Sequence, residues 1–371
     1  MTAQEERDPQ AWRVFQATGV PPRGTAPSLP EPPAWRRFAG GPALPVPPAD
    51  EPSELRRLGR VDITPHLDES EVDTVNAALL LRRPLLVTGP PGVGKSTLAY
   101  LIARELDLGR VLSWNIVSRT TLRDGLYAYD AIGRAQAIAA WRAEVRAPDP
   151  DDSRRQIVSP ASPPSERTGA PTDAEQRPYR PPTLGDFFTL GPLGTALLPY
   201  DRPRVLLVDE LDKSDIDLPN DLLHALENGS YDIVELARDA ADTAAVHTDD
   251  PGGRADILRG RVECRQFPIV VITSNGEREF PAAFRRRCLP LEMRMPGKEQ
   301  LLAIVRSHLE ADEEQAEPLV EQFLQQVQGG GTHSLDQLLN AVQLTTMGGF
   351  QADGSGRKLV ESLLRDLAKG R

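Results

Sequence analysis

LLVTGPPGVGKST, residues 85–97, decides the fold that this sequence of 371 residues predicts. An apolar run ends at Thr88, a glycine-rich turn follows it, and Lys95 and Ser96 open a segment whose apolar residues recur at helical spacing. The letters match the phosphate-binding loop G-x-x-x-x-G-K-[ST], and the order of strand, loop and helix matches its context. The stretch therefore predicts a site for a nucleoside triphosphate rather than a chance glycine-rich turn.

The chemistry of the loop explains its residue types. Gly92 and Gly94 can adopt backbone angles that are closed to other residues, so successive N–H groups can converge on one anion. The following helix adds its positive N-terminal end. We expect Lys95 to reach the β and γ phosphates of ATP and the Ser96 hydroxyl to bind Mg²⁺. The predicted nucleotide-binding segment comprises Gly89, Pro90, Pro91, Gly92, Val93, Gly94, Lys95, Ser96 and Thr97.

A second signal is the acidic pair Asp209 and Glu210, which follows the apolar residues 205–208, VLLV. Four consecutive apolar residues are typical of a buried parallel strand, and such sheets bind ligands at the carboxyl ends of their strands. We expect Asp209 to bind Mg²⁺, directly or through water, and Glu210 to polarise the water that attacks the γ-phosphate. Alone, the pattern also fits a strand end with solvated acids, but the phosphate loop favours the catalytic role.

Two weaker signals follow along the chain. Asn275 comes soon after the apolar run at residues 270–273, where its amide could orient water or contact the γ-phosphate, although asparagine also ends ordinary strands. Arg285, Arg286 and Arg287 cannot all face the phosphate of their own chain, so the cluster invites an anion from outside. An arginine supplied in trans accelerates phosphoryl transfer by about 10³ to 10⁵. The alternative is a solvated basic helix end.

The order of these signals is phosphate loop, acidic strand end, strand with asparagine, arginines and helical tail. In this order, and in the wording GPPGVGKST, VLLVDELDKSDIDLPNDLLHALENG and VVITSNGEREFPAAFRRRC, the chain resembles the AAA+ ATPases, and the MoxR branch in particular. The likeness covers residues 61–347 apart from a proline-rich insertion. It implies an α/β P-loop fold with a five-stranded parallel sheet, flanking helices and a small α-helical lid. It also implies a ring, usually hexameric, with ATP between subunits.

The resemblance implies a role for each residue of the motifs. One departure concerns the second sensor, an arginine that the family often has early in a lid helix. Here residues 333–337 read HSLDQ, so either another group closes the lid on the γ-phosphate or lid closure is weakly coupled to the nucleotide state. The matching positions are the phosphate and Mg²⁺ ligands Lys95 and Ser96, the metal aspartate Asp209, the catalytic glutamate Glu210, the first sensor Asn275, and the arginine finger Arg287, with Arg286 as the alternative.

Residues 1–56 form an arm with 12 prolines and few aliphatic residues. Because so little apolar surface cannot offset the entropy of ordering, we expect the arm to be extended or disordered. It contains a small repeat, WRVF at residues 12–15 and WRRF at residues 35–38. Aromatic and arginine side chains dominate interface hot spots, so these motifs could dock on a partner or on a neighbouring subunit. They could equally fold back on the chain's own surface.

The rest of the chain divides into an α/β domain, residues 57–295, and a helical lid domain, residues 296–371. Within the α/β domain we expect a flexible proline-rich insertion at 147–182 and, from its Asp, Gly and Ala content, a surface insertion at 237–260. The spacing of apolar and capping residues predicts the remaining elements. These are a helix after the capping box of Asp68 and Glu71, strands at 85–88, 111–117, 205–208, 269–273 and 289–295, a helical run to about 145, a helix at 218–228 that ends at Gly229, and lid helices at 299–309, 314–327, 334–347 and 358–367.

Bulk properties limit the function classes. The net charge of -11 argues against a chain-wide basic surface for nucleic acid, although a local basic patch is possible. No apolar run approaches the ~18 residues of a membrane span, and the N-terminus has no apolar signal region, so we expect a cytoplasmic protein. Cys264 and Cys288 suit neither a zinc site nor a disulfide framework and are expected to be reduced thiols.

These observations together indicate a Mg²⁺-dependent ATPase that remodels a protein partner. MoxR-like proteins are remodelling or chaperone ATPases, commonly with a von Willebrand factor A-type partner, and some belong to bacterial defence-type operons. Tyr127 and Tyr129 follow the second strand, where relatives place substrate-facing insertions, so they could grip a polypeptide or pack on their own subunit. Two other functions stay open: a switch whose ATP binding sets assembly and recruits an effector, and a DNA-acting motor, against which the net acidity speaks.

Overall fold

A computed structural model describes residues 12–21, 24, 27–58, 67–146, 181–309, 313–329, 333–347 and 354–364. Several expected features lie outside these ranges. They are Val61, residues 147–180 of the proline-rich insertion, and residues 365–367 at the end of the last expected lid helix. No helix within the described ranges is long and apolar enough to cross a membrane.

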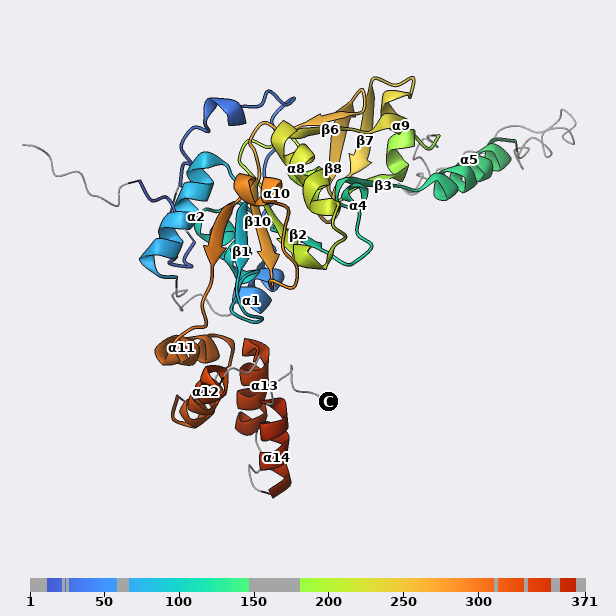
Figure 1. The fold of residues 1–371 in the computed structure, drawn as a ribbon. Coiled ribbons are helices and arrows are strands. Elements are labelled where there is room, and N and C mark those ends of the chain that lie inside the picture. Colours follow the sequence, from blue (N-terminus) through green and yellow to red (C-terminus); the bar gives the residue numbers. More distant parts are fainter. Residues whose placement is uncertain are drawn as a thin grey trace, which may run out of the picture.

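A five-stranded sheet carries the phosphate loop (Figure 1). Its strand order is β11-β1-β10-β5-β2, and every neighbouring pair is parallel. The predicted five-stranded parallel sheet is therefore confirmed, with its second and fifth strands shorter than expected. The strands are β1 (Leu85–Thr88), β2 (Leu112–Asn115), β5 (Val205–Asp209), β10 (Ile269–Ser274) and β11 (Leu289–Glu292).

Both faces of this sheet are covered, which explains its continuous apolar strands. Successive residues of a strand point to opposite faces. In β5, Val205 and Leu207 accordingly belong to one apolar cluster, with α2 and α3, while Leu206 and Val208 belong to another, with α8 and the second sheet. The covering helices are α2 (Glu69–Leu81), α3 (Thr97–Glu105), α7 (Pro192–Ala196), α8 (Leu218–Asn228) and α10 (Ala282–Arg287).

Local signals fix the ends of two of these helices as the sequence predicts. The Asp68 carboxylate accepts the backbone N–H of Glu71, and the Glu71 side chain accepts that of Asp68, so the capping box begins α2. Gly229 ends α8 with a positive φ of 59°, a conformation that costs glycine little.

A second, six-stranded sheet lies beside the first (Figure 1). The stretch 237–260 supplies its hairpin β7–β8, and is thus more than the surface insertion that its composition suggested. Val246, Ala255 and Ile257 are buried in the core, so one face of the hairpin packs inward. Asp249, Asp250, Gly252 and Gly253 belong to the turn between its two strands. In order, the strands are β3 (Tyr127–Tyr129), β4 (Phe188–Leu190), β7 (Thr243–His247), β8 (Arg254–Leu258), β9 (Arg261–Glu263) and β6 (Ser230–Asp232).

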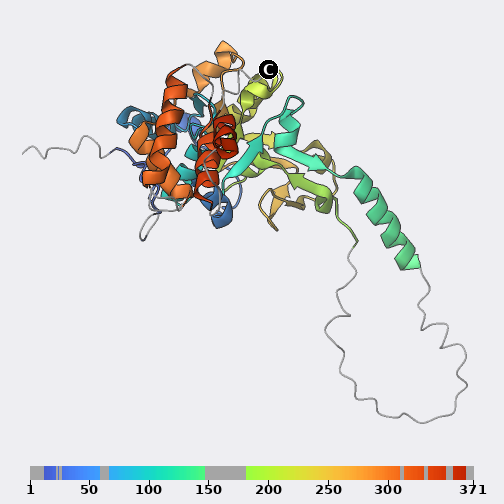
Figure 2. The same cartoon turned by 90° about the horizontal axis from the view of Figure 1, so that it is seen from below.

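Aromatic stacking anchors the first strand of this sheet. Tyr129 stacks on Phe188 with ring centroids 4.5 Å apart, and Tyr127 stacks on Tyr231 at 6.5 Å. Of the two roles open to these tyrosines, the structure has them packing on their own subunit. After β3 the helix α5 (Ala131–Arg146) extends away from the sheets (Figure 2). The short elements around them are α4 (Leu122–Leu126), η2 (Leu184–Phe187) and α9 (Val234–Ala237).

A buried ion pair joins the stretch before β5 to the turn of the hairpin. Arg204 is fully buried, and both terminal nitrogens of its guanidinium lie 2.8 Å from the carboxylate of Asp250. Burial alone would raise the pKa of Asp250, but the hydrogen bonds and charges of Arg204 and Arg110 outweigh burial and lower it.

Burial raises the pKa of both thiols, Cys264 and Cys288, to about 12, and both cysteines are free.

The lid domain has its own apolar core. Figure 1 shows its helices set apart from both sheets. Leu301, Phe323 and Leu338 come from three different helices and are fully buried in one apolar cluster. The predicted lid helices are present within the described residues: α11 (Lys298–His308), α12 (Glu313–Gln328), α13 (Leu335–Thr346) and α14 (Gly354–Leu363).

The N-terminal arm docks on its own chain, which corrects the expectation of disorder for its described part. Phe15 is fully buried between α2 and α3. The backbone N–H groups of Val14 and Phe15 donate to Asn76 Oδ1 at 2.7 and 3.0 Å, and Asn76 Nδ2 donates back to the Phe15 carbonyl at 2.7 Å. The arm needs few aliphatic residues because its backbone hydrogen bonds are satisfied by the α/β domain.

The second repeat of the arm docks in a similar way. The guanidinium of Arg36 lies 4.5 Å from the ring centroid of Phe267, on which Phe38 stacks at 5.9 Å. In each repeat the phenylalanine packs inward, whereas Trp12 is 40% and Trp35 75% exposed. The arm contains η1 (Ala34–Arg36). The helix α1 (Glu51–Leu58) begins in the arm and ends two residues beyond it.

We predict that Phe15→Ala lowers the free energy of unfolding by about 3 to 5 kcal/mol, because it empties a fully buried aromatic site. Trp35→Ala, in the second repeat of the arm, is the control and should cost less than ~1 kcal/mol since this tryptophan is 75% exposed. Urea unfolding of the full chain measures both. Equal effects of the two substitutions would contradict the docked arm.

Candidate functional site

The phosphate loop joins β1 to α3 and has the backbone that its glycines predict. Gly92 and Gly94 have φ values of 78° and 92°, in the region that other residues rarely adopt. A Cβ atom at Gly92 would lie 2.5 Å from the backbone nitrogen of Leu335, at the start of the lid helix α13. The loop therefore adjoins the lid directly, and only glycine fits at that contact.

Lys95 is a buried ammonium whose hydrogen-bond partners are all uncharged. Its side chain is only 7% exposed, and Nζ donates at 2.8 Å to the carbonyls of Gly89 and Pro90 and to Asn275 Oδ1. Burial lowers its pKa, and the negative charge of Asp212, chief among nearby carboxylates, partly opposes that shift. Within the described part of the chain it forms no ion pair, so the position suits an anionic ligand.

Two hydroxyls converge on one oxygen of Asp209. Ser96 Oγ donates to Oδ1 at 2.7 Å, and Thr273 Oγ1 donates to the same atom at 2.6 Å. Thr273 Oγ1 in turn accepts the backbone N–H of Glu210 at 2.8 Å. The predicted metal ligands Ser96 and Asp209 are thus adjacent, and hydroxyl and carboxylate oxygens are the donors that Mg²⁺ prefers.

Glu210 has an unusual backbone for its residue type. Its φ of 59° is left-handed, and the hydrogen bond from its N–H to Thr273 helps to hold it there. One carboxylate oxygen accepts from Lys213 Nζ at 2.5 Å and the other from Asn275 Nδ2 at 3.4 Å. Asn275 therefore contacts both Lys95 and Glu210 through the two ends of its amide.

Asp212 and Lys213 belong to this site, although the sequence analysis missed them. Asp212 is 4% exposed, and its Oδ2 accepts the backbone N–H groups of Asn275 at 2.9 Å and Glu277 at 3.1 Å. It thereby fixes the turn that carries Asn275. The single turn η3 (Leu211–Lys213) brings both residues back toward β10. The pattern D-E-x-D-K at residues 209–213 was the signal in the sequence that could have indicated these two residues. Only the turn shows that both belong to the site.

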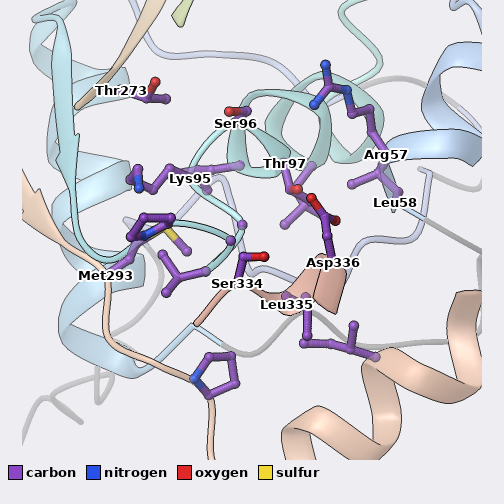
Figure 3. A pocket seen from close by; sticks show the side chains of 18 of the residues that line it. Arg57, Leu58, Lys95, Ser96, Thr97, Thr273, Met293, Ser334, Leu335 and Asp336 are labelled. Atoms are coloured by element: carbon purple, nitrogen blue, oxygen red, sulfur yellow. The ribbon is translucent and has the colours of Figure 1, made fainter. Parts of the chain in front are cut away.

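A cavity of about 590 Å³ extends from the phosphate loop to the lid and the arm (Figure 3). Figure 3 shows Lys95, Ser96 and Thr97 on the loop side and Ser334, Leu335 and Asp336 of the lid facing them. The stretch 333–337 of the lid has no arginine for a second sensor. It instead presents an acidic residue, Asp336, to the cavity. Apolar side chains from α1, the segment before α2 and the lid also line it, namely Leu58, Leu67, Ile304 and Leu339.

The arginine cluster lies elsewhere, on α10, and does not line this cavity. Arg287 forms an ion pair with Glu227 of α8, and Arg286 Nε donates to the carbonyl of Ala282 at 3.3 Å. Arg83 donates to the backbone carbonyls of both arginines. The structure therefore does not bring Arg286 or Arg287 to the phosphate loop of their own chain.

Residues 85–139, which include the phosphate loop and α3, match the ATPase family associated with various cellular activities (AAA). This stretch is similar to an AAA-type ATPase domain. No curated protein matches it. Among solved structures, NtrX from Brucella abortus in complex with ADP is similar to 82% of this chain and 56% of its own, with 14% sequence identity and a TM-score of 0.35. The chain thus spans little more than half the length of NtrX, and its fold follows from its own strand order.

We predict that Thr273→Val weakens the Mg²⁺-dependent part of ATP affinity about tenfold, because it removes one hydroxyl that both orients Asp209 and holds Glu210, as outer-shell partners of metal ligands do. Thr273→Ser keeps the hydroxyl and should bind like the wild type. Titration of ATP with and without Mg²⁺ measures the effect. A Val variant with unchanged Mg²⁺ dependence would show that the hydroxyl has no role in this site.

Proposed function

We propose that this ATPase is a MoxR-like AAA+ protein that binds ATP with Mg²⁺, hydrolyses it between subunits and remodels a protein partner. One observation carries the proposal. Lys95, the Ser96–Asp209 pair, Glu210 and Asn275 come from separate stretches of the chain and form one hydrogen-bonded group at the carboxyl ends of β1, β5 and β10. Parallel α/β sheets bind their ligands at that edge.

In this proposal the residues have distinct roles. Lys95 and the backbone N–H groups of residues 92–97 bind the phosphates, while Ser96 and Asp209 hold Mg²⁺, which neutralises phosphate charge when bound. Glu210 accepts a proton from the attacking water, and Asn275 orients it. The apolar end of the cavity, between arm and lid, takes the adenine, since such pockets combine apolar walls with a few polar groups.

In the proposed ring, the arginines of α10 complete the site of a neighbouring subunit. The resemblance to MoxR-like proteins suggests that this ring is a hexamer. The role of these arginines is supported by their distance in sequence and structure from the cavity of their own chain. Arg287 has to leave Glu227 before it can reach a neighbour's phosphate, whereas Arg286 needs no such release because its guanidinium has only a backbone partner among the described residues. Both arginines remain candidates for the finger.

The resemblance to MoxR-like proteins suggests that the protein partner has a von Willebrand factor A-type domain. A switch that recruits an effector is the second candidate, and the exposed tryptophan of each arm repeat supports it. The two candidates differ in turnover. A remodelling ATPase hydrolyses ATP continuously, whereas a switch assembles on ATP and turns over slowly.

We predict that Glu210→Gln retains ATP binding and lowers the steady-state rate of phosphate release by about 10² or more, because the amide cannot accept the proton. Lys95→Ala serves as the contrasting variant and should lose ATP binding itself. Equilibrium binding and phosphate release measure the two properties separately. Retained turnover in the Gln variant would remove Glu210 from the mechanism.

Mixing two inactive variants tests the shared site. Lys95→Ala subunits cannot bind ATP but still present their arginines, while subunits with Arg286→Ala and Arg287→Ala bind ATP but lack them. We predict that each alone is slower than the wild type by about 10³ and that an equimolar mixture regains measurable activity. An arginine double variant with the wild-type rate would contradict hydrolysis between subunits.

A further inference from the structure

Lys213 makes a direct contact with Glu210 that neither phosphate binding nor the Mg²⁺ site explains. Its Nζ donates to Glu210 Oε2 at 2.5 Å, and both side chains are about two-fifths exposed, at 42% and 41%. This hydrogen bond is the main cause of a raised pKa of Lys213. The lysine is therefore charged and held beside the carboxylate.

The backbone places Lys213 there for a reason that is visible in the fold. Glu210 is left-handed, and the turn η3 follows it at once, closed by a hydrogen bond from the N–H of Lys213 to the carbonyl of Glu210 at 3.0 Å. Leu211 and Asp212 point into the protein and are buried. The turn consequently leaves the third residue, Lys213, on the same outer side as the Glu210 carboxylate.

The other carboxylate oxygen has a weaker partner. Asn275 Nδ2 lies 3.4 Å from Glu210 Oε1, at the long end of hydrogen-bond distances, while the amide oxygen of Asn275 is engaged by Lys95. Lys213 is thus the closer of the two groups that restrict rotation of the Glu210 side chain. A general base has to lie within about 2.6 to 3.2 Å of the proton that it accepts, so its orientation matters.

Such a pair has two conceivable uses, stability or orientation. Half-exposed ion pairs contribute little to the stability of a protein because water screens them and the long side chains lose entropy. Orientation is different, since a small misplacement of a reacting group can lower a rate about 10²-fold. The geometry therefore favours a role in turnover rather than in folding.

We propose that Lys213 is a positioning residue that holds the Glu210 carboxylate in the orientation in which it accepts a proton from water. This inference rests on the proposed ATPase mechanism, in which Glu210 is the general base. Among the described residues, Glu210 is the hydrogen-bond and ion-pair partner of the Lys213 side chain, and the proposed role needs no contact with the nucleotide.

The first test compares Lys213→Met with Lys213→Arg in the full chain. We expect the Met variant to lower kcat about tenfold, as partial misplacement of a reacting group does, with KM for ATP unchanged. The Arg variant retains the charge and should recover most of the rate. Lys298→Met is the matched control, because Lys298 pairs with Glu317 and Glu321 on the lid surface, at 2.7 and 2.5 Å, outside the site. An unchanged kcat in Lys213→Met overturns the proposal.

A double-mutant cycle separates positioning from an independent role. In a Glu210→Gln background the substitution Lys213→Met should cause no further decrease in the residual rate, because the group that it positions has been removed. A further tenfold decrease in that background would show that Lys213 acts without Glu210 and would overturn the proposal.

The pair can also be tested without turnover, because the sequence has only five lysines. An amine-reactive reagent followed by peptide mass spectrometry measures how fast each lysine is acylated. We expect Lys213 to react several-fold faster in Glu210→Gln, since loss of the carboxylate increases its neutral fraction, with Lys298 as the unchanged reference. Equal labelling of Lys213 in both proteins overturns the inference, whereas absence of turnover in a wild type that shows the labelling difference contradicts only the proposed function.

Discussion

The parallel register of β1, β10 and β5 is the constraint on which the rest of the site depends. Thr88 is level with Ser274, and Ile272 is level with Val208, so the three strands end at one edge. The phosphate loop leaves β1 there, and Asp209 ends β5 beside it. Because side chains alternate between faces, a shift of one residue in β5 would turn Asp209 away from the loop. Apolar packing on both faces of the sheet prevents that shift.

The buried ammonium of Lys95 is the electrostatic counterpart of that register. Its desolvation is unfavourable, and carbonyl and amide oxygens offset only part of the cost. An anion in the cavity would supply the missing charge, so binding energy and folding stability are linked here, as for any ligand that binds only the native state. The carboxylates of Asp209 and Glu210 instead accept hydrogen bonds from hydroxyls and from Lys213, so Lys95 has no ion pair within the described residues.

The sequence predicts those features that a contiguous stretch determines. The phosphate loop, the five strands and the capping box each depend on neighbouring residues, and all are present. The docking of Phe15 on Asn76 could not be predicted, because composition cannot report a hydrogen bond across 61 residues. In the stretch 237–260 the turn residues obscured the alternation that defines a hairpin. Asp212 and Lys213 gain their roles only from a turn that follows a left-handed residue, a conformation that no propensity of glutamate indicates.

Among the described residues, the arginines and the lysine that line the cavity come from α1, α3 and the phosphate loop. Arg56 and Arg57 line it from α1 and Arg104 from α3. Acidic side chains also line it, namely Asp209 and Glu210 at the end of β5 and Asp336 of α13 in the lid. The arm is tied to α3 by the ion pair of Arg104 with Glu54 of α1, at 3.4 Å. A triphosphate is therefore attracted to the α/β domain and its arm, not to the first turn of α13. The lid meets the phosphate loop through packing, where α13 approaches it too closely for any residue but glycine.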